Sequence, residues 1–445
     1  MAISPARLAA FEILLQVERA GAYAADLLHA SQVNRLSDAD KALSTELVMG
    51  VLRWRARLDH ALASACEQPL AKLDLEVLTA LRLGSYQLGF LERVPPRAAV
   101  HESVELAKRA RKRSAAPLVN AVLRRLTDKK EMFHVEHRET EPSAREVADR
   151  CSHPQWMVDR WAKHFEISVA ARICEFDQAV PVTALRLAGE VTDDDLRCEG
   201  IEVTPGALLA RARRVVSGDT TKSKAFATGR IAIQDEASQL VAALVGAGGR
   251  ILDCCAAPGG KTAALAERNP QATIVAVELH PHRARTLRRR APAANVRVLV
   301  ADALALPLDL DFDRVLVDVP CSGTGTLARN PEIKWRLEPG DLADLHRKQV
   351  AILRAALERV APGGRLVYST CSLEPEENGA VVEEALAARS GFRLLDCSEE
   401  LRKLRETGEL VWSEPESLTR AGFLQTLPGI HPCDGFFVAI IERDA

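Results

Sequence analysis

The feature that most constrains the fold is a series of five short apolar runs in the C-terminal half of the chain. They are RILDCCA (250–256), TIVAVEL (273–279), VRVLVAD (296–302), DRVLVDVP (313–320) and GRLVYSTC (364–371). Helix-like segments separate them. Short apolar strands that alternate with helices are typical of a doubly wound α/β fold with a parallel sheet. Functional groups in such a fold are expected at the carboxyl ends of the strands.

The rest of the chain predicts two further domains. Residues 1–130 carry apolar side chains at helical spacing, and Ser37 followed by Asp40 is a capping-box pattern, so we expect an all-α domain there. Residues 131–149 are polar and predict a linker, in which His134 and His137 are expected to be surface residues. Residues 150–228 predict a small α+β domain, with strands at 183–189, 201–208 and 213–218 and a capped helix at 192–200. The α/β domain then occupies residues 229–445.

Composition excludes some classes of protein. The chain has 59 Lys and Arg against 61 Asp and Glu, a net charge of −2, which neither favours nor excludes a nucleic-acid partner. Basic runs at 108–113 and 124–130 are typical of a solvated helix face or of an RNA-phosphate surface. The N-terminus has no signal-peptide pattern, and no apolar run reaches the roughly 20 residues of a membrane span. We expect a cytoplasmic protein.

The ten cysteines show no Cys-x-x-Cys pair or other zinc-type spacing. We therefore expect reduced thiols and no metal site.

The segment CCAAPGGKTAAL (254–265) ends like a phosphate-binding loop. Such a loop needs Gly-x-x-x-x-Gly-Lys-Thr, but Cys255 occupies the position of the first glycine. Pro258 also removes a backbone N–H from a loop whose purpose is to donate N–H groups. The segment is better explained as a glycine turn that lets a nucleoside approach the backbone.

Acidic residues follow the strands after this turn. Such a fold predicts an acid about 20 positions on, for ribose hydroxyls, and Glu278 fits. Asp302, which we expect to face the adenine, ends the third run and Asp318 ends the fourth. A row of acidic residues without a phosphate-binding loop favours a nucleoside whose tail is cationic and not anionic. S-adenosylmethionine, which carries a cationic sulfonium, is such a ligand. A helix N-cap is the alternative role for each acid taken singly.

Two cysteines end adjacent runs, Cys321 in DVPCSGTG and Cys371 in YSTCS. A lone cysteine is most often a small buried apolar residue, and zinc ligation lacks partners of suitable spacing. A methyl donor and thiols in one crevice fit methylation at C5 of a pyrimidine. A thiolate adds to C6, C5 accepts the methyl group, and the thiol leaves by elimination. Asp318 is placed to act near the ring N3.

Six segments together resemble the RNA cytosine-C5 methyltransferases: QDEASQ (234–239), CCAAPGGKT (254–262), DVPCSGTG (318–325), NPEIKW (330–335), YSTCS (368–372) and DGFFVAII (434–441). The resemblance implies a Rossmann-like class I methyltransferase domain, with Cys371 as nucleophile and Cys321 assisting product release. The implied donor-binding residues are Cys255, Ala256, Ala257, Pro258, Gly259, Gly260, Lys261, Glu278, Asp302 and Asp318. Glu278 replaces a more frequent Asp, and Arg283 is expected to be structural.

The N-terminal segments ELVMGVLRWRARLDHAL (46–62) and LVNAVLRRL (118–126) resemble the NusB-like RNA-binding domain of one branch of this family. That branch acts on cytosine 967 of 16S ribosomal RNA, so the implied partner is 16S rRNA, bound by a monomer. A tRNA target, a C5-uracil enzyme and a non-catalytic RNA-binding factor are the alternatives. Lys334 and Trp335 are candidates for RNA contact, with packing of the motif loop as the other explanation for Trp335.

Overall fold

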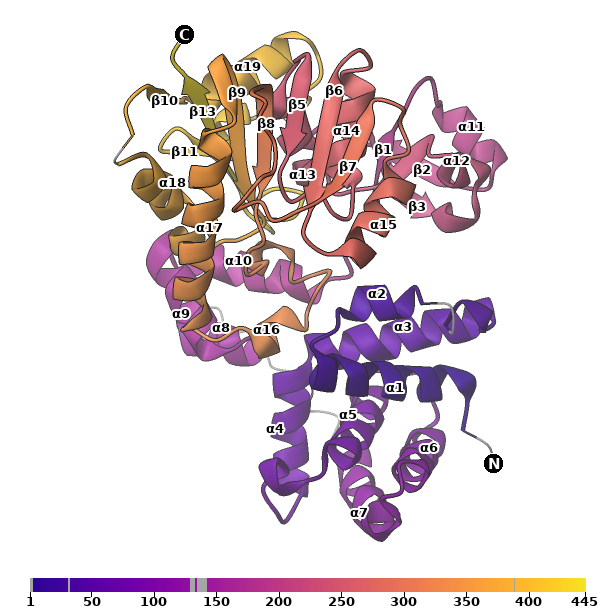
Figure 1. The fold of residues 1–445 in the computed structure, drawn as a ribbon. Helices are drawn as coiled ribbons and strands as arrows, with labels where there is room; N and C mark the ends of the chain where they lie inside the picture. Colours follow the sequence, from indigo (N-terminus) through magenta and orange to yellow (C-terminus); the bar gives the residue numbers. More distant parts are fainter. Residues whose placement is uncertain (1–2, 31–32, 129–132, 134–141, 388) are drawn as a thin grey trace. The chain divides into compact units, whose positions relative to one another are not determined.

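The computed structural model describes residues 3–30, 33–128, 133, 142–387 and 389–445, which form two compact units (Figure 1). Unit 1 comprises Met1–Val180 with Leu327–Leu337, and unit 2 comprises Pro181–Thr326 with Glu338–Ala445. This division does not follow the expected boundaries at 130, 149 and 228. No helix in the described part of the chain is long and apolar enough to cross a membrane.

Unit 1 is helical. The sequence predicts helices for residues 1–130, whereas the helices at 144–178 fall in the expected linker and in the first part of the expected α+β domain. The helices of unit 1 are α1 (Pro5–Ala20), α2 (Ala24–Leu28), α3 (Asp38–Arg53), α4 (Arg55–Ala65), α5 (Leu75–Phe90), α6 (Pro96–Arg109), α7 (Ala116–Thr127), α8 (Ala144–Arg150), α9 (Gln155–Phe165), α10 (Ile167–Gln178) and α16 (Ile333–Arg336). Ser37 caps α3 by accepting the Asp40 N–H at 3.2 Å, and its hydroxyl donates to the Asp40 carboxylate at 2.7 Å, so the expected N-cap is present.

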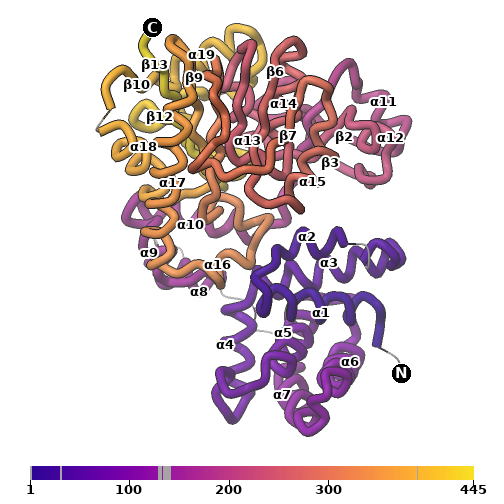
Figure 2. The backbone as a smooth tube through the Cα atoms, in the orientation of Figure 1, coloured from indigo at the N-terminus to yellow at the C-terminus, as the bar shows by residue number. Residues whose placement is uncertain are grey.

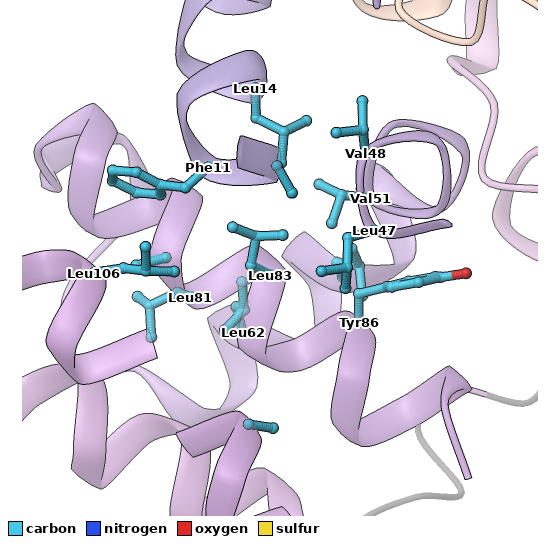
Figure 3. Packing of buried hydrophobic residues seen from close by; sticks show 14 of the residues in the cluster. Phe11, Leu14, Leu47, Val48, Val51, Leu62, Leu81, Leu83, Tyr86 and Leu106 are labelled. Atoms are coloured by element: carbon cyan, nitrogen blue, oxygen red, sulfur yellow. The ribbon is translucent and has the colours of Figure 1, made fainter. Parts of the chain in front are cut away.

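The core of unit 1 lies between α1, α3, α4, α5, α6 and α7, where leucine, valine and aromatic side chains pack together (Figure 3). Gly50 of α3 packs directly against the ring of Tyr86 of α5. A Cβ at position 50 would lie 2.0 Å from the Tyr86 Cζ, so only glycine allows these helices to approach so closely.

Two expectations about unit 1 need correction or completion. Residues 131–149 are not irregular throughout, because α8 begins at Ala144, where Ser143 and Glu146 form a capping box. His134 and His137 lie outside the described residues. In the two basic runs, Lys108 pairs with Glu105, Lys112 with Asp74 and Arg125 with Glu67, whereas Lys129 and Lys130 are outside the described residues.

A small antiparallel sheet opens unit 2, in the order β2-β3-β1-β4. Its strands are β1 (Ala184–Leu187), β2 (Glu202–Pro205), β3 (Ala212–Ser217) and β4 (Ile231–Ile233), joined by the helices α11 (Asp193–Cys198) and α12 (Lys224–Ala227). The expected strands and the capped helix are therefore confirmed. Thr192 and Asp195 form the capping box of α11.

All five apolar runs form strands of a nine-stranded sheet, β5 (Arg250–Asp253), β6 (Thr273–Glu278), β7 (Val296–Val300), β8 (Phe312–Asp318) and β9 (Val360–Thr370). They are parallel, in the order β9-β8-β5-β6-β7. The chain adds an antiparallel part that the runs do not predict: β10 (Phe392–Leu395), β11 (Thr419–Arg420), β12 (Phe423–Thr426) and β13 (Phe436–Arg443), with β13 beside β9.

Helices cover both faces of this sheet, because alternate strand residues point to opposite sides. Ile251 and Val367 pack on the face of α13 (Glu236–Val245), α14 (Gly260–Arg268) and α19 (Cys397–Glu406), whereas Leu252 and Leu366 pack on the face of α17 (Asp341–Leu357) and α18 (Gly379–Leu386). Figure 2 follows the backbone from β6 through α15 (Pro281–Arg290) to β7. The fold is the expected doubly wound α/β domain, extended to a mixed sheet.

Candidate active site

The carboxyl ends of the parallel strands meet at one edge of the sheet. Asp253 ends β5, Glu278 ends β6 and Asp318 ends β8, while Cys371 follows the last residue of β9. Because β8 lies between β5 and β9, the side chains at these three strand ends are neighbours. The edge is therefore the candidate active site.

The loop after β5 turns sharply into α14. The Ala256 N–H donates to the Val277 carbonyl at 2.9 Å, which ties the loop to β6. Gly259 has a φ of 110°, and a Cβ there would lie 2.9 Å from Leu287 Cδ1. Only glycine tolerates both the backbone conformation and the contact. The turn therefore places backbone without side chains at the edge of the sheet where the parallel strands end.

Lys261, in the first turn of α14, reaches across to the end of β8. Its Nζ donates to Asp318 Oδ2 at 2.8 Å and lies 5.0 Å from the centre of the Phe436 ring. Ser369 Oγ donates to the other Asp318 oxygen at 2.7 Å. Burial lowers the pKa of Lys261, but the charge and hydrogen bond of Asp318 outweigh it, and the net shift is upward. Lys261 is therefore a fixed cation of the site.

Asp253 is a site residue that the sequence patterns did not single out. Its carboxylate is buried and accepts the Thr262 hydroxyl at 2.6 Å through Oδ2, while Oδ1 has no hydrogen-bond partner among the described residues. Burial raises its pKa to about 7, with a further rise from the charge of Asp318. The available signal was an acidic residue within the first apolar run, where the structure ends β5.

The two cysteines expected to act together lie in contact, with 3.3 Å between their Sγ atoms. The hydrogen bond to Cys371, burial and the nearby Glu377 charge raise the pKa of Cys321 well above its ordinary value. Burial likewise raises the pKa of Cys255 to about 12. Cys321 and Cys255 are therefore protonated thiols at neutral pH.

Glu377 joins the two cysteine loops, and no sequence pattern predicted this role. It is fully buried in the turn before α18. Its carboxylate accepts the Ser322 N–H at 2.8 Å, the hydroxyls of both Ser322 and Ser372, and the Gln349 amide at 2.8 Å. Ser322 and Ser372 each directly follow one of the cysteines. One carboxylate thus fixes the distance between the two thiols.

The cysteine loops also contact the segment before β13. The Gly325 N–H donates to the Cys371 carbonyl at 2.9 Å, and the Gly435 N–H donates to the Gly325 carbonyl at 2.7 Å. A Cβ on Gly325 would lie 2.2 Å from the Gly435 carbonyl oxygen. The motifs CSGTG and DGFFVAII, far apart in sequence, therefore pack backbone to backbone.

Glu278 and Asp302 stand apart from this group. Glu278 is buried, accepts the His280 N–H at 2.8 Å and lies 3.6 Å from Arg283, whose guanidinium also donates to the Ala257 carbonyl at 3.1 Å. Asp302 is exposed and accepts the Leu304 N–H at 2.9 Å in a turn that no helix follows, so it is not the helix N-cap that was its alternative role. No group of three metal-ligating side chains occurs in the described ranges.

The expectation that Lys334 contacts RNA is wrong. Lys334 lies in unit 1, is 1% exposed, and donates to the carbonyls of Arg53 at 2.9 Å and Ser152 at 3.0 Å. Burial lowers its pKa to about 7. Trp335 donates its indole N–H to the Leu52 carbonyl at 2.6 Å. The NPEIKW motif is thus a packing element of the helical unit.

The fold and the site together define a methyltransferase of the doubly wound class: a glycine turn after the first strand, acids at strand ends, and two thiols in contact at the same edge of the sheet. A crystallised methyltransferase homologue from Pyrococcus horikoshii is similar to the chain, with 27% identity and a TM-score of 0.55 over 68% of this chain and 100% of that one.

Residues 245–442 match the family model described as 16S rRNA methyltransferase RsmB/F, and residues 4–128 match the NusB family. The probable ribosomal RNA small subunit methyltransferase B of Bacillus subtilis is 34% identical over 98% of both chains. The corresponding protein of Vibrio cholerae is 32% identical over 98% of this chain and 97% of its own. The chain therefore belongs to the RsmB/F family of 16S rRNA methyltransferases.

Proposed function

We propose that the chain transfers a methyl group from S-adenosylmethionine to C5 of a cytosine in 16S rRNA, at position 967, through a covalent adduct between Cys371 and C6 of the base. It acts as a monomer in the cytoplasm. The observation that carries this proposal is the pair of thiols, 3.3 Å apart, beside the Lys261–Asp318 ion pair. Family membership supports the RNA substrate.

Cys371 is the nucleophile of the proposed reaction. Its thiolate forms a bond to C6, and the electrons of the C5–C6 double bond move to C5, which makes C5 a carbon nucleophile. Negative charge also develops toward N3, and the Lys261 cation, held in place by the adjacent Asp318 carboxylate, can stabilise it in the proposed reaction. The methyl group passes to C5 as its bond to the donor sulfur breaks, which leaves a neutral thioether. The C5 proton then passes to solvent, the electrons of the C–H bond restore the double bond, and the bond between sulfur and C6 breaks to release the Cys371 thiolate.

Cys321 is the partner thiol for release. Its S–H lies within hydrogen-bond distance of Cys371 Sγ, so it can donate to the leaving thiolate and stabilise it. Burial among Glu377, Ser322 and Ser372 fixes the geometry before substrate binds. Preorganised groups of this kind lower the barrier because they need no rearrangement during the reaction.

The residues of the donor site fit S-adenosylmethionine. When bound, it supplies an electrophilic methyl group on a cationic sulfonium. The site offers carboxylates at 253, 278 and 318 and bare backbone at Gly259 and Gly260, where an added Cβ at 260 meets only the Gln234 side chain, at 3.5 Å. In the proposal the loop 255–261 and Glu278 hold the nucleoside, and Asp302 caps the loop that borders it.

The test is incubation of the protein with a 16S rRNA transcript and methyl-labelled donor, followed by digestion to nucleosides and mass spectrometry. The expected product is 5-methylcytidine, mapped to position 967, and its loss in Cys371→Ser. Labelled 5-methyluridine would show that the target base is uracil. Label that appears in a tRNA transcript but not in the 16S rRNA transcript would show that the substrate is tRNA. No transfer to any RNA by the correctly folded protein would favour a non-catalytic RNA-binding role.

A further inference from the structure

Helix α15 carries an unusual concentration of arginines. Its sequence PHRARTLRRR has no acidic residue, and Arg285, Arg288, Arg289 and Arg290 are all exposed. Arg297, on the adjacent strand β7, is exposed as well. Figure 1 shows α15 beside β7, and the two elements are in contact. The whole chain has a net charge of −2, so this positive surface is a local feature.

These arginines lack the acidic partners that several exposed arginines of unit 2 have. Arg347 pairs with Asp344 and Arg402 with Glu406, in both cases one turn away on the same helix. Within the described residues, none of the five arginines of this surface forms an ion pair. Their hydrogen bonds go to neutral groups, Arg288 to the Val298 carbonyl at 3.4 Å and Arg297 to the Ala294 carbonyl at 3.0 Å.

Such an arrangement is unfavourable in the free protein. Arg285 and Arg289 are four residues apart on the helix, and Arg285 and Arg288 are three apart. Like charges at these spacings destabilise a helix by roughly 0.2–0.5 kcal/mol per pair. The helix dipole favours cations in the last turn, which accounts for Arg288 to Arg290 but not for Arg285 or Arg297. A polyanion on the surface would remove the repulsion.

The surface begins at the candidate active site. The first turn of α15 is attached to the donor loop, because Arg283 donates to the Ala257 carbonyl at 3.1 Å and lies 3.6 Å from Glu278. The helix starts directly after the carboxyl end of β6 and so leaves from the edge that carries the two cysteines. A long ligand reacting at that edge can continue along α15.

We propose that Arg285, Arg288, Arg289, Arg290 and Arg297 bind the phosphate backbone of the RNA substrate. Guanidinium groups bind phosphate oxygens through two parallel hydrogen bonds, and these arginines have no carboxylate partner in the described residues to compete with phosphate. Helix α15 contains no Phe, Tyr or Trp for stacking on bases, so we assign the arginine surface to positioning of the RNA backbone and not to reading of its sequence. The inference rests on the proposed function and identifies how its RNA is held.

The experiment compares two triple variants of the full chain. The first is Arg285→Gln, Arg289→Gln and Arg297→Gln. The control is Arg347→Gln, Arg393→Gln and Arg402→Gln, which removes three exposed arginines of the same unit that have acidic partners. Both lose the same charge. Affinity for a 16S rRNA transcript is measured over a series of salt concentrations, and affinity for S-adenosylmethionine is measured by calorimetry.

We expect the α15 variant to bind RNA at least about tenfold more weakly, and the slope of log K against log salt to fall by about 2 to 3, since each lost phosphate contact removes roughly 0.7–0.9. Donor affinity should be unchanged, and the control should keep the wild-type slope. If the two variants have the same RNA affinity and the same slope of log K against log salt, the proposal is wrong. An acidic protein would then be the alternative partner for this surface.

Failure of this inference differs from failure of the proposed function. If the wild type forms 5-methylcytidine while the α15 variant binds RNA as the control does, the arginine surface is wrong and the function stands. If the wild type transfers no methyl group but its RNA binding depends on α15, the surface stands without the proposed chemistry.

Discussion

The Sγ atoms of Cys321 and Cys371 lie 3.3 Å apart, although 50 residues separate them in the chain. The contact follows from topology. Strands β8 and β9 are parallel neighbours with Asp318 opposite Ser369, so the loops that carry the cysteines leave from the same edge. The separation is well beyond the roughly 2.05 Å of a disulfide bond, so the two residues are free thiols in hydrogen-bond contact.

The surroundings of the two thiols differ. Cys321 faces the buried Glu377 and remains protonated, because its pKa is raised by its bond to Cys371 and by burial. A protonated Cys321 suits the part of hydrogen-bond donor in the proposed reaction. The assignment of Cys371 as the nucleophile rests on the resemblance of its motif to the family.

The first prediction separates the two cysteines. Cys321→Ala should accumulate a covalent complex with RNA, because adduct formation continues while release fails. Cys371→Ala should form neither complex nor product. Denaturing gels of each variant with 16S rRNA and donor show the complex as a band of reduced mobility. The opposite pattern would make Cys321 the nucleophile, and normal methyl transfer by both variants would exclude the thiol mechanism.

The second prediction concerns Glu377. The change Glu377→Gln keeps the size of the side chain but replaces an acceptor of the Ser322 and Ser372 hydroxyls with an amide N–H₂. We expect kcat to fall by about 100-fold, since misplacement of reacting groups by about 1 Å costs that much. Removal of the buried charge should also lower the pKa of Cys321, which the pH dependence of its alkylation in a Cys371→Ala background reports.

Glu383→Gln, an exposed substitution on α18, is the matched control for this change. It should leave both the rate and the alkylation profile unaltered. A Glu377→Gln protein that loses activity with no change in the alkylation profile would show that the carboxylate only supports the fold.

The parts of the fold that the sequence predicts are those with a local signal. Buried parallel strands consist of apolar residues throughout, so the five runs were recognisable, and their last residues marked the edge where Asp318 and Cys371 lie. The antiparallel strands β10 to β13 were missed as additions to this sheet. Pairing between β13 and β9 depends on residues about 70 positions apart in sequence, and no local pattern encodes it.

The site was predictable to a similar extent. Side chains at strand ends can be read from the sequence, but Glu377 lies in a short turn, and its role depends on serines about 5 and 55 residues away that the fold brings together. Lys334 shows the reverse error. A lysine in a polar motif is normally exposed, and only the packing of residues 327–337 into the helical unit buries it.

The third prediction is energetic coupling between Lys261 and Asp318. The pair is largely buried, with side-chain exposures of 13% and 28%. Breaking such a pair leaves an uncompensated charge and costs on the order of 3 kcal/mol, whereas removing both partners costs less than the sum. Hydrogen exchange of β8 and β9 in Lys261→Met, Asp318→Asn and the double variant measures the local free energy of opening. Additive effects would show that the two groups do not stabilise each other.

The fourth prediction is a pH-dependent gain in stability from Asp253→Asn. Burial raises the pKa of Asp253 from 3.8 to about 7 in the folded state. Between about pH 4 and pH 7 the unfolded chain ionises this group while the folded chain keeps its proton, so the wild type loses stability as pH rises through that window. The loss is complete above pH 7 and amounts to on the order of 4 kcal/mol.

Asparagine does not ionise, so the difference in Tm between variant and wild type should shift in favour of the variant from pH 5 to pH 8. Asp309→Asn, at an exposed position, should show no such shift. A difference in Tm that stays constant with pH would mean that Asp253 is ionised in the folded protein, and its unpartnered Oδ1 would then need a cation or a donor hydrogen bond to stabilise it.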